Sequence, residues 1–211
     1  MKRSDIEKMF KHLSAENPAP KTELVSTSPY TMLVAVVLSA QATDVGVNKA
    51  TPALFAVADT PEKMVKLGET KVLNFVHSIG LYRVKAKNII ALSKMLIEEH
   101  GSTVPNDRDA LEKLPGVGRK TANVVLNNVF DQPTIAVDTH VFRVSNRTGL
   151  ARGKTPHAVE KTLEKAVPDK WKQHAHHWLI LHGRYVCKAR KPDCPTCLIA
   201  KLCTFKAKTI D

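Results

Sequence analysis

The sequence has 211 residues, of which 43% are hydrophobic, a length and composition typical of a globular protein with one or two domains. Disorder and fibrous repeats are therefore excluded. The 32 Lys and Arg side chains outnumber the 20 Asp and Glu side chains and give a formal net charge of +12, which indicates a polyanionic partner. All four Cys residues follow residue 186, a distribution that excludes the disulfide framework of a secreted protein.

Neither an export signal nor a membrane span is expected. The first ten residues read MKRSDIEKMF, so charged side chains interrupt any apolar signal core. The longest apolar run, Met32 to Leu38, has seven residues, whereas crossing a bilayer takes about 20. We therefore expect a soluble cytoplasmic protein without a membrane partner, in which clustered thiols stay reduced and more often bind metal.

The positive charge is concentrated in the last third of the chain. Residues 133–211 carry fifteen basic and six acidic side chains, a net charge of +9, whereas residues 1–21 and 22–132 carry +2 and +1. A solvated basic face without a partner is the alternative to a polyanion-binding surface, but it explains so uneven a distribution poorly.

The pattern is helical throughout, which predicts an all-α fold. Ser28, Thr60 and Thr155 each precede a proline, as N-caps do at helix starts. Ser28 introduces a helix over 30–40 that is apolar on nearly all sides. A longer amphipathic helix spans 83–99 and ends before a glycine. Its apolar stripe comprises Val84, Ala86, Ile89, Ile90, Leu92, Met95 and Leu96.

Two short helices are predicted to meet at the turn in LPGVGRK, the first ending at Leu114 and the second beginning near Gly118. Gly116 and Gly118 permit a positive φ and leave backbone N–H groups unshielded at a helix N-terminus. Such a turn can bind an anion, for example a DNA phosphate. A purely structural turn is the alternative, because Pro-Gly turns between helices are common.

Lys120 lies in the first turn of the second helix, where the helix dipole and the neighbouring charge of Arg119 both favour the neutral amine. A neutral lysine is a nucleophile that can attack an electrophilic carbon and form a Schiff base. A lysine that contacts phosphate or solvent is the more frequent case. The unusual position near the positive end of the dipole is what singles out Lys120.

Eighteen residues later, Asp138 precedes a helix that begins around Thr139, with His140 close by. Asp138 is either a helix cap or a catalytic carboxylate. If it faces Lys120, it can stabilise positive charge on a sugar carbon while the amine captures that carbon.

The four cysteines, spaced C-x6-C-x2-C-x5-C, favour one metal centre over strained disulfides, and the spacing leaves zinc and iron–sulfur both open. They are Cys187, Cys194, Cys197 and Cys203. Basic side chains flank them and can bind phosphates: Lys188, Arg190, Lys191, Lys201, Lys206 and Lys208. The preceding helix, 171–185, contains histidines that we interpret as packing or surface residues: His174, His176, His177 and His182.

Together, LPGVGRKTA, VDTHVFRV and the cysteine spacing resemble the bacterial endonuclease III family of helix-hairpin-helix DNA glycosylases. Two further stretches, LSAQATD at 38–44 and SIGLY at 78–82, support the resemblance, which extends over about residues 30–203. No motif position departs from the family pattern. Chance agreement of five motifs in one order is negligible.

The resemblance implies two all-helical domains with the active site in a cleft between them. A central domain, 22–132, would contain the helix-hairpin-helix at about 107–130. A second domain would combine 1–21 with 133–211 around a [4Fe–4S] cluster whose loop spans 187–203. We expect the cluster to hold the basic loop against phosphates.

The implied activity is that of a bifunctional DNA glycosylase and AP lyase of base excision repair, acting as a nucleoid-associated monomer on double-stranded DNA. Its substrates would be oxidised or ring-saturated pyrimidines and abasic sites, reached after base flipping. The implied catalytic residues are Lys120, which forms the Schiff base, and Asp138. We expect eight residues to contact DNA: Gln41, Ile79, Leu81, Gly116, Gly118, Arg119, His140 and Lys191. Core packing is the alternative for Ile79 and Leu81.

Two rival functions stay open. An adenine-mismatch DNA glycosylase shares the cysteine spacing, but such enzymes usually lack a lysine at the position of Lys120 and carry a further C-terminal domain. A non-catalytic DNA-binding module would use the hairpin and a zinc loop only for docking. A brown colour would exclude zinc, and covalent trapping on abasic DNA would exclude a passive module.

Overall fold

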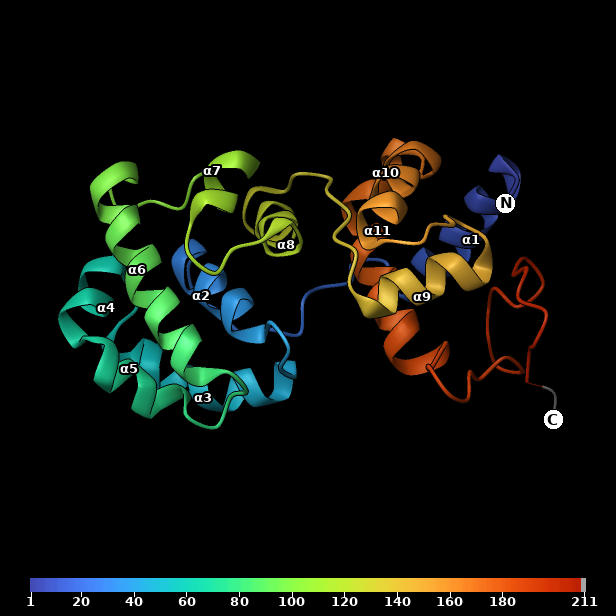
Figure 1. Ribbon diagram of the computed structural model, residues 1–211. Helices are drawn as coiled ribbons and strands as arrows, with labels where there is room; N and C mark the ends of the chain where they lie inside the picture. The colour runs from blue at the N-terminus through green and yellow to red at the C-terminus, as the bar shows by residue number, and fades with distance from the viewer. Residues whose placement is uncertain (210–211) are drawn as a thin grey trace. The chain divides into compact units, whose positions relative to one another are not determined.

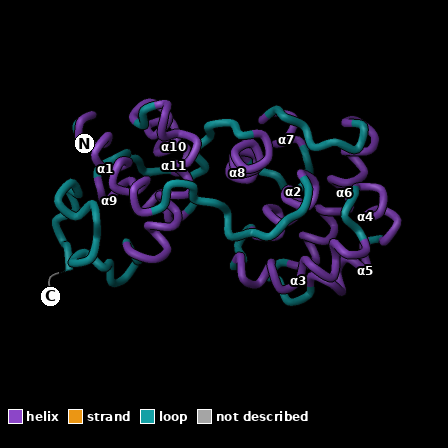
Figure 2. Tube along the Cα trace, turned by 180° about the vertical axis from the view of Figure 1, so that it is seen from behind, coloured by secondary structure: helices purple, strands orange, loops and turns teal. Residues whose placement is uncertain are grey.

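The computed structural model describes residues 1–209, and this part of the chain contains helices and loops but no strand (Figures 1 and 2). The all-α prediction is therefore confirmed. The helices are α1 (Arg3–Glu16), α2 (Pro29–Ser39), α3 (Asp44–Val57), α4 (Pro61–Leu67), α5 (Glu69–Val76), α6 (Tyr82–His100), α7 (Arg108–Lys113), α8 (Arg119–Phe130), α9 (Thr139–Thr148), α10 (Pro156–Ala166) and α11 (Asp169–Leu181). The π-helix η1 (His182–Val186) continues α11.

The chain divides into two compact units. The central unit is Thr22–Phe130, and the terminal unit joins Met1–Lys21 to Asp131–Asp211. Each unit has its own packed helices and buried side chains. No helix within residues 1–209 is long and apolar enough to cross a membrane.

Helix α2 forms the centre of the central unit. Nine of its eleven residues, Tyr30–Leu38, are buried, as its apolar sequence predicts. It packs against α3, α6 and α8, while α6 also covers α4 and α5. The Tyr30 hydroxyl lies 2.6 Å from the Ser93 hydroxyl of α6. Burial raises the pKa of Tyr30, so this phenol stays protonated and links the two helices.

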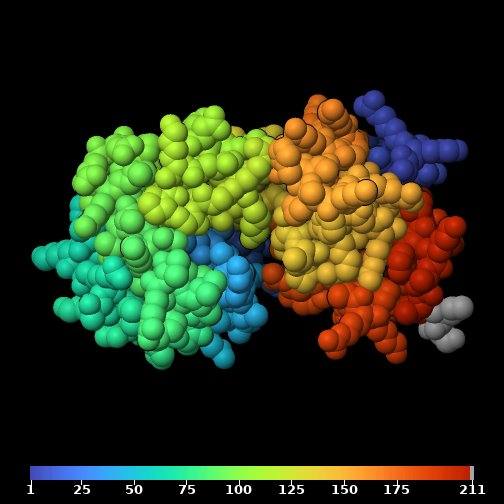
Figure 3. Space-filling model, viewed as in Figure 1, coloured from blue at the N-terminus to red at the C-terminus, as the bar shows by residue number. Residues whose placement is uncertain are grey.

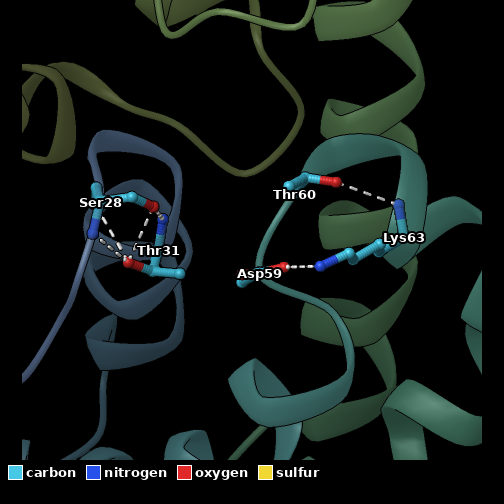
Figure 4. Close-up of polar contacts among 5 residues, drawn as sticks. All are labelled: Ser28, Thr31, Asp59, Thr60 and Lys63. Atoms are coloured by element: carbon cyan, nitrogen blue, oxygen red, sulfur yellow. Dashed lines mark hydrogen bonds and ion pairs between the residues drawn. The ribbon is translucent and has the colours of Figure 1, made fainter.

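Side-chain caps begin α2 and α4 as the sequence predicts (Figure 4). The Ser28 hydroxyl accepts a hydrogen bond from the Thr31 N–H, and the Thr31 hydroxyl accepts one from the Ser28 N–H, which completes a capping box. The Thr60 hydroxyl accepts from the Lys63 N–H. Each bond satisfies a backbone donor that the first helical turn leaves open.

Helix α6 runs one residue beyond the predicted span at each end, from Tyr82 to His100, and ends at Gly101 in the left-handed conformation. Most of the predicted apolar stripe is buried, but Val84 is 58% exposed and was wrongly included. Lys85 is instead buried, at 4% exposure. Near its start, the helix therefore turns Lys85 inward rather than Val84.

Aromatic side chains join α1 to α11 in the terminal unit. The Phe10 ring lies 6.4 Å from the Trp171 ring and 6.0 Å from the Trp178 ring, measured between centroids. The Trp178 indole N–H donates to the Asn17 carbonyl at 2.7 Å. These contacts fix the N-terminal helix against residues some 160 positions later in the chain.

Helix α11 was predicted to continue to Tyr185 as one helix. Its α-helical part ends at Leu181, and the wider π-helix η1 carries the chain to Val186. Gly183 lets η1 approach α9 closely, because a Cβ at that position would lie 2.8 Å from the His140 Cβ. The change of helix type thus brings the cysteine loop alongside α9.

Candidate functional site

The predicted hairpin forms between α7 and α8, which pack against each other (Figure 1). The Asp107 carboxylate caps α7 by accepting from the Ala110 N–H at 2.8 Å. The chain turns after Leu114, whose carbonyl accepts from the Val117 N–H at 3.0 Å. Helix α8 begins at Arg119, close to the predicted start.

The two hairpin glycines have different structural roles. Gly116 has φ +81°, and a Cβ there would lie 2.8 Å from the Asn88 amide nitrogen of α6. Gly118 does not adopt the positive φ that a glycine permits, and a Cβ at Gly118 would meet no atom within 4 Å. Gly118 lies directly before the first residue of α8, at a helix-cap position that does not require a positive φ. Of the two positions, only 116 has a backbone conformation that favours glycine.

Replacing Gly116 with serine is expected to lower the free energy of unfolding by about 2 kcal/mol, because serine is strained at positive φ and its Cβ meets Asn88. Urea unfolding followed by circular dichroism measures the change. The matched control is Gly118→Ser, which we expect to stay within about 0.5 kcal/mol of the unsubstituted protein. Equal losses in the two variants would contradict a special role for the Gly116 turn.

Lys120 lies in the first turn of α8 and is half-buried. Arg119, one residue earlier, has a guanidinium nitrogen 3.8 Å from a carboxylate oxygen of Glu112 on α7. That ion pair crosses the hairpin and turns the arginine toward α7. No acidic side chain lies in the first turn of α8, so both cations adjoin the positive end of the helix dipole.

Asp138 caps α9 in the terminal unit: its carboxylate accepts from the Val141 N–H at 2.8 Å. The extended residues just before it, Ile135 to Val137, are buried. The His176 ring Nδ1 lies 2.8 Å from the Ala136 carbonyl and must donate to it, since a carbonyl can only accept. A buried histidine on α11 thus helps to hold the segment that ends at Asp138.

His140 is half-buried on the first turn of α9. Its Nδ1 lies 3.2 Å from a guanidinium nitrogen of Arg143, which therefore donates to it. Arg143 also donates to the carbonyls of Gly183 at 2.7 Å and Cys187 at 2.9 Å. His140, two residues after Asp138, is therefore linked through Arg143 to the start of the cysteine loop.

The three residues predicted to enter DNA differ in exposure. Gln41 and Leu81 are exposed, and both have a positive φ, 53° and 61°, on loops between helices. Ile79 is only 3% exposed and packs in the central unit. A Cβ at Gly80 would lie 3.6 Å from the Gln41 carbonyl, so the two loops adjoin.

The four cysteines predicted to bind a metal centre line one cavity in the terminal unit. The cavity has about 360 Å³ free of protein atoms, part of it open to solvent. All four are free thiols: Cys187, Cys194, Cys197 and Cys203. Within residues 1–209, no three His, Cys, Asp or Glu side chains are arranged to hold a single metal ion. Burial raises the pKa of the Cys197 and Cys203 thiols.

Hydrogen-bond donors surround the thiols. The Phe205 N–H donates to the Cys203 sulfur at 3.4 Å, and a guanidinium nitrogen of Arg147 lies 3.7 Å from the Cys187 sulfur. The His182 ring Nε2 is 3.6 Å from the Cys197 sulfur and donates to it in the tautomer that has its proton on Nε2. Donors of this kind stabilise thiolates, the form that binds metals.

Arg147 of α9 also fixes the backbone of the loop, which lies at the surface beside α9 (Figure 3). It donates to the carbonyls of Lys188 and Ala189, each at 2.7 Å, and lies over the Phe205 ring. Lys191, two residues further on, is exposed.

Sequence reasoning missed Arg143 and Arg147 as loop anchors. Their spacing of four residues places both on one face of α9, which was the available signal. The interpretation of the histidines as packing residues agrees with the burial of His176, His177 and His182. Burial also lowers the pKa of His177 to about 3, so its ring stays neutral.

Residues 34–169 match the family described as HhH-GPD superfamily base excision DNA repair protein. Endonuclease III of Rickettsia conorii is 60% identical over 205 residues, covering 97% of this chain and 98% of the relative. Endonuclease III of Escherichia coli K12 is 58% identical over 196 residues, covering 93% of each.

A solved structure of a trapped endonuclease III–DNA covalent intermediate aligns with a TM-score of 0.91 at 46% identity. It covers 97% of this chain and 96% of that chain. A non-covalent endonuclease III–DNA complex aligns with the same score. These likenesses extend over both units of the chain, including the hairpin and the cysteine loop. The chain therefore belongs to the endonuclease III family of DNA glycosylases with AP lyase activity, enzymes of base excision repair.

Proposed function

We propose that the chain removes oxidised or ring-saturated pyrimidines from duplex DNA and then cleaves the strand through a Schiff base on Lys120. The position of Lys120 carries this proposal: it is a half-buried amine in the first turn of α8, directly after a glycine turn suited to a phosphate. One of the related solved structures is a trapped endonuclease III–DNA covalent intermediate, which supports covalent chemistry in this family.

The first half of the reaction releases the damaged base. The nucleotide must leave the stack, at a cost of a few kcal/mol that is smaller when damage has weakened its stacking. The Lys120 amine then forms a bond to C1′ as the bond from C1′ to the base breaks. The Asp138 carboxylate stabilises the positive charge that develops on the sugar and helps to deprotonate the amine.

The second half cleaves the strand. Opening of the sugar ring gives an imine between Lys120 and C1′, and the positive charge of the protonated imine acidifies the C2′ proton. Loss of that proton expels the 3′ phosphate by β-elimination. Hydrolysis of the imine then frees Lys120.

DNA contacts are assigned to two surfaces of the central unit. The hairpin N–H groups around Gly116 and Gly118, with Arg119 beside them, suit a strand phosphate. Gln41 and Leu81 are exposed on adjoining loops and suit insertion into the gap that a flipped base leaves. Ile79 would support this loop from the core, since its side chain is buried.

We assign the cysteine cavity to a [4Fe–4S] cluster. Four thiolates around one zinc ion stand ~3.8 Å apart, as follows from a Zn–S bond of about 2.3 Å in a tetrahedron. A cube of iron and sulfide lies between its ligands and keeps them farther apart, which suits thiols that line a cavity without converging on one ion. The bound cluster would hold Lys191, and the other cations of the loop, in place for phosphates. His140 would contact DNA from α9.

Replacing Asp138 with asparagine separates its two roles. Asparagine caps helices as well as aspartate does, so the melting temperature should stay within about 2 °C. Base release should fall about 100-fold, because the carboxylate charge is lost. Single-turnover assays on a thymine glycol duplex measure the rate. A variant that loses stability and keeps its rate would assign Asp138 to the cap alone.

A panel of defined duplexes tests the proposed function. We expect base release and strand cleavage on thymine glycol and no release from an adenine mismatch. Release of adenine alone would favour the adenine-mismatch glycosylase, and DNA binding without release would favour a docking module. Since the substrate would be chromosomal DNA, we place the protein at the nucleoid in the cytoplasm, acting as a monomer.

A further inference from the structure

The start of α6 contains a buried ammonium group without a hydrogen-bond partner. Lys85 is 4% exposed, and its Nζ has no partner within residues 1–209. Burial lowers its pKa. Removing an ammonium group from water without giving it a partner costs free energy, so Lys85 lowers the stability of the DNA-free protein.

The same helix end is unusually positive. Helix α6 has 19 residues, its N-cap Leu81 gives no side-chain cap, and its first turn has no acidic residue. The first turn of α6 therefore supplies no carboxylate of its own to neutralise its N–H groups and the positive end of its dipole. Arg83 adds an exposed cation in that turn.

Helix geometry lets us infer that the Lys85 side chain extends toward this end of the helix. Side chains on an α-helix point back toward the N-terminus, so the Lys85 stem runs over the turn that begins at Leu81. The Lys85 N–H donates to the Leu81 carbonyl at 3.1 Å, which places the two residues on one face. Asn88, one turn later, contacts the hairpin at Gly116.

We propose that the N-terminus of α6 is a second phosphate site, in which the first-turn N–H groups bind a phosphodiester of the DNA strand and Lys85 supplies a cation beneath it. The site is separate from the hairpin turn and lies beside the exposed Leu81 and Gln41 loops. It rests on the proposed function, since DNA is the ligand.

The neighbouring residues explain why the ligand would be a strand phosphate. The loops of Gln41 and Leu81 adjoin at the start of α6, and we assign both to the gap in the duplex. A backbone that passes these loops brings its phosphates past the first turn of α6. The bound phosphate would supply the counter-charge that Lys85 lacks in the free protein.

Replacing Lys85 with methionine, which keeps the length of the stem, tests the site with two readouts of opposite sign. The melting temperature should rise by about 3 °C, because an uncompensated charge is removed. The affinity for a duplex with a tetrahydrofuran abasic analogue should fall about 5-fold. The slope of log affinity against log salt should become shallower by about 0.9, as expected for one lost phosphate contact.

The matched control is Lys94→Met, an exposed lysine near the other end of α6, for which both quantities should stay unchanged. A Lys85→Met protein that is stabilised but binds DNA with the original affinity and salt slope overturns the site. A destabilised Lys85→Met protein also overturns it, because the ammonium would then be compensated in the free protein. Failure of the unsubstituted protein to bind the duplex would instead refute the proposed function.

Discussion

Replacing Lys120 with alanine is expected to abolish covalent trapping of the protein on abasic DNA by borohydride. Reduction traps only an imine, and alanine has no amine to form one. Strand cleavage at the abasic site should fall by about 1,000-fold or more under single-turnover conditions. The measurement is a denaturing gel on which the trapped complex migrates more slowly than the free protein.

Binding must be measured beside trapping, because a variant that fails to bind DNA also fails to trap. Affinity for the tetrahydrofuran duplex should stay within about 3-fold in Lys120→Ala, since the substitution leaves unchanged the hairpin N–H groups and the loops that we assign to DNA insertion. Lys71→Ala, an exposed lysine on α5, should trap as well as the unsubstituted protein. Equal trapping by Lys120→Ala would assign the imine to another amine.

The order of effects also separates Lys120 from Asp138. If Lys120 is the nucleophile, as we propose, its loss removes both base release and strand cleavage through the imine. Loss of the Asp138 charge slows the formation of the imine and leaves an amine that can still be trapped, given time. A long incubation with borohydride should therefore recover a trapped complex in Asp138→Asn and none in Lys120→Ala.

The helix starts were predictable because caps are local. Ser28, Thr60 and Thr155 each bond to an N–H three residues later, so the sequence around each contains both partners. The Asp138 cap follows the same rule. The sequence left open whether Asp138 also has a catalytic role. The hydrogen bond from the Val141 N–H does not exclude that role, since a carboxylate has two oxygens.

Burial was less predictable, because it depends on segments far apart in the chain. The pattern of α6 placed Val84 inside and gave no reason to bury Lys85, and packing against other helices reversed that assignment. Both hairpin glycines permit a positive φ, but of the two only Gly116 adopts one. Likewise, the contact of His176 with Ala136 joins residues 40 positions apart.

The cysteine loop could be predicted only in part, because its structure depends both on local spacing and on contacts with a distant helix. The spacing of the thiols predicted a single centre, whereas the anchoring of the loop by Arg143 and Arg147 required the position of α9. These arginines bond to backbone carbonyls, so the identity of the loop side chains gives no sign of them. The basic side chains of the loop are therefore carried by a backbone that two arginines of α9 anchor.

Replacing Cys197 with alanine is expected to remove the proposed cluster. Iron content should fall from about four atoms per chain to nearly none, and the broad visible absorbance should disappear with it. The melting temperature should fall by about 10 °C, because metal binding contributes to the folding of small loops that have little core. Iron assay, absorbance and thermal unfolding measure the three effects.

Thr196→Ala, an exposed neighbour in the same loop, is the matched control and should keep its iron. DNA affinity should fall in Cys197→Ala and its salt slope should become shallower, because Lys191 and the neighbouring cations lose their fixed positions. The hairpin surface of the central unit would still bind phosphate. One zinc per chain in the unsubstituted protein, or full iron content in Cys197→Ala, would refute the assignment. A loss of iron without any change in salt slope would separate the cluster from DNA binding and leave the loop cations without their proposed role.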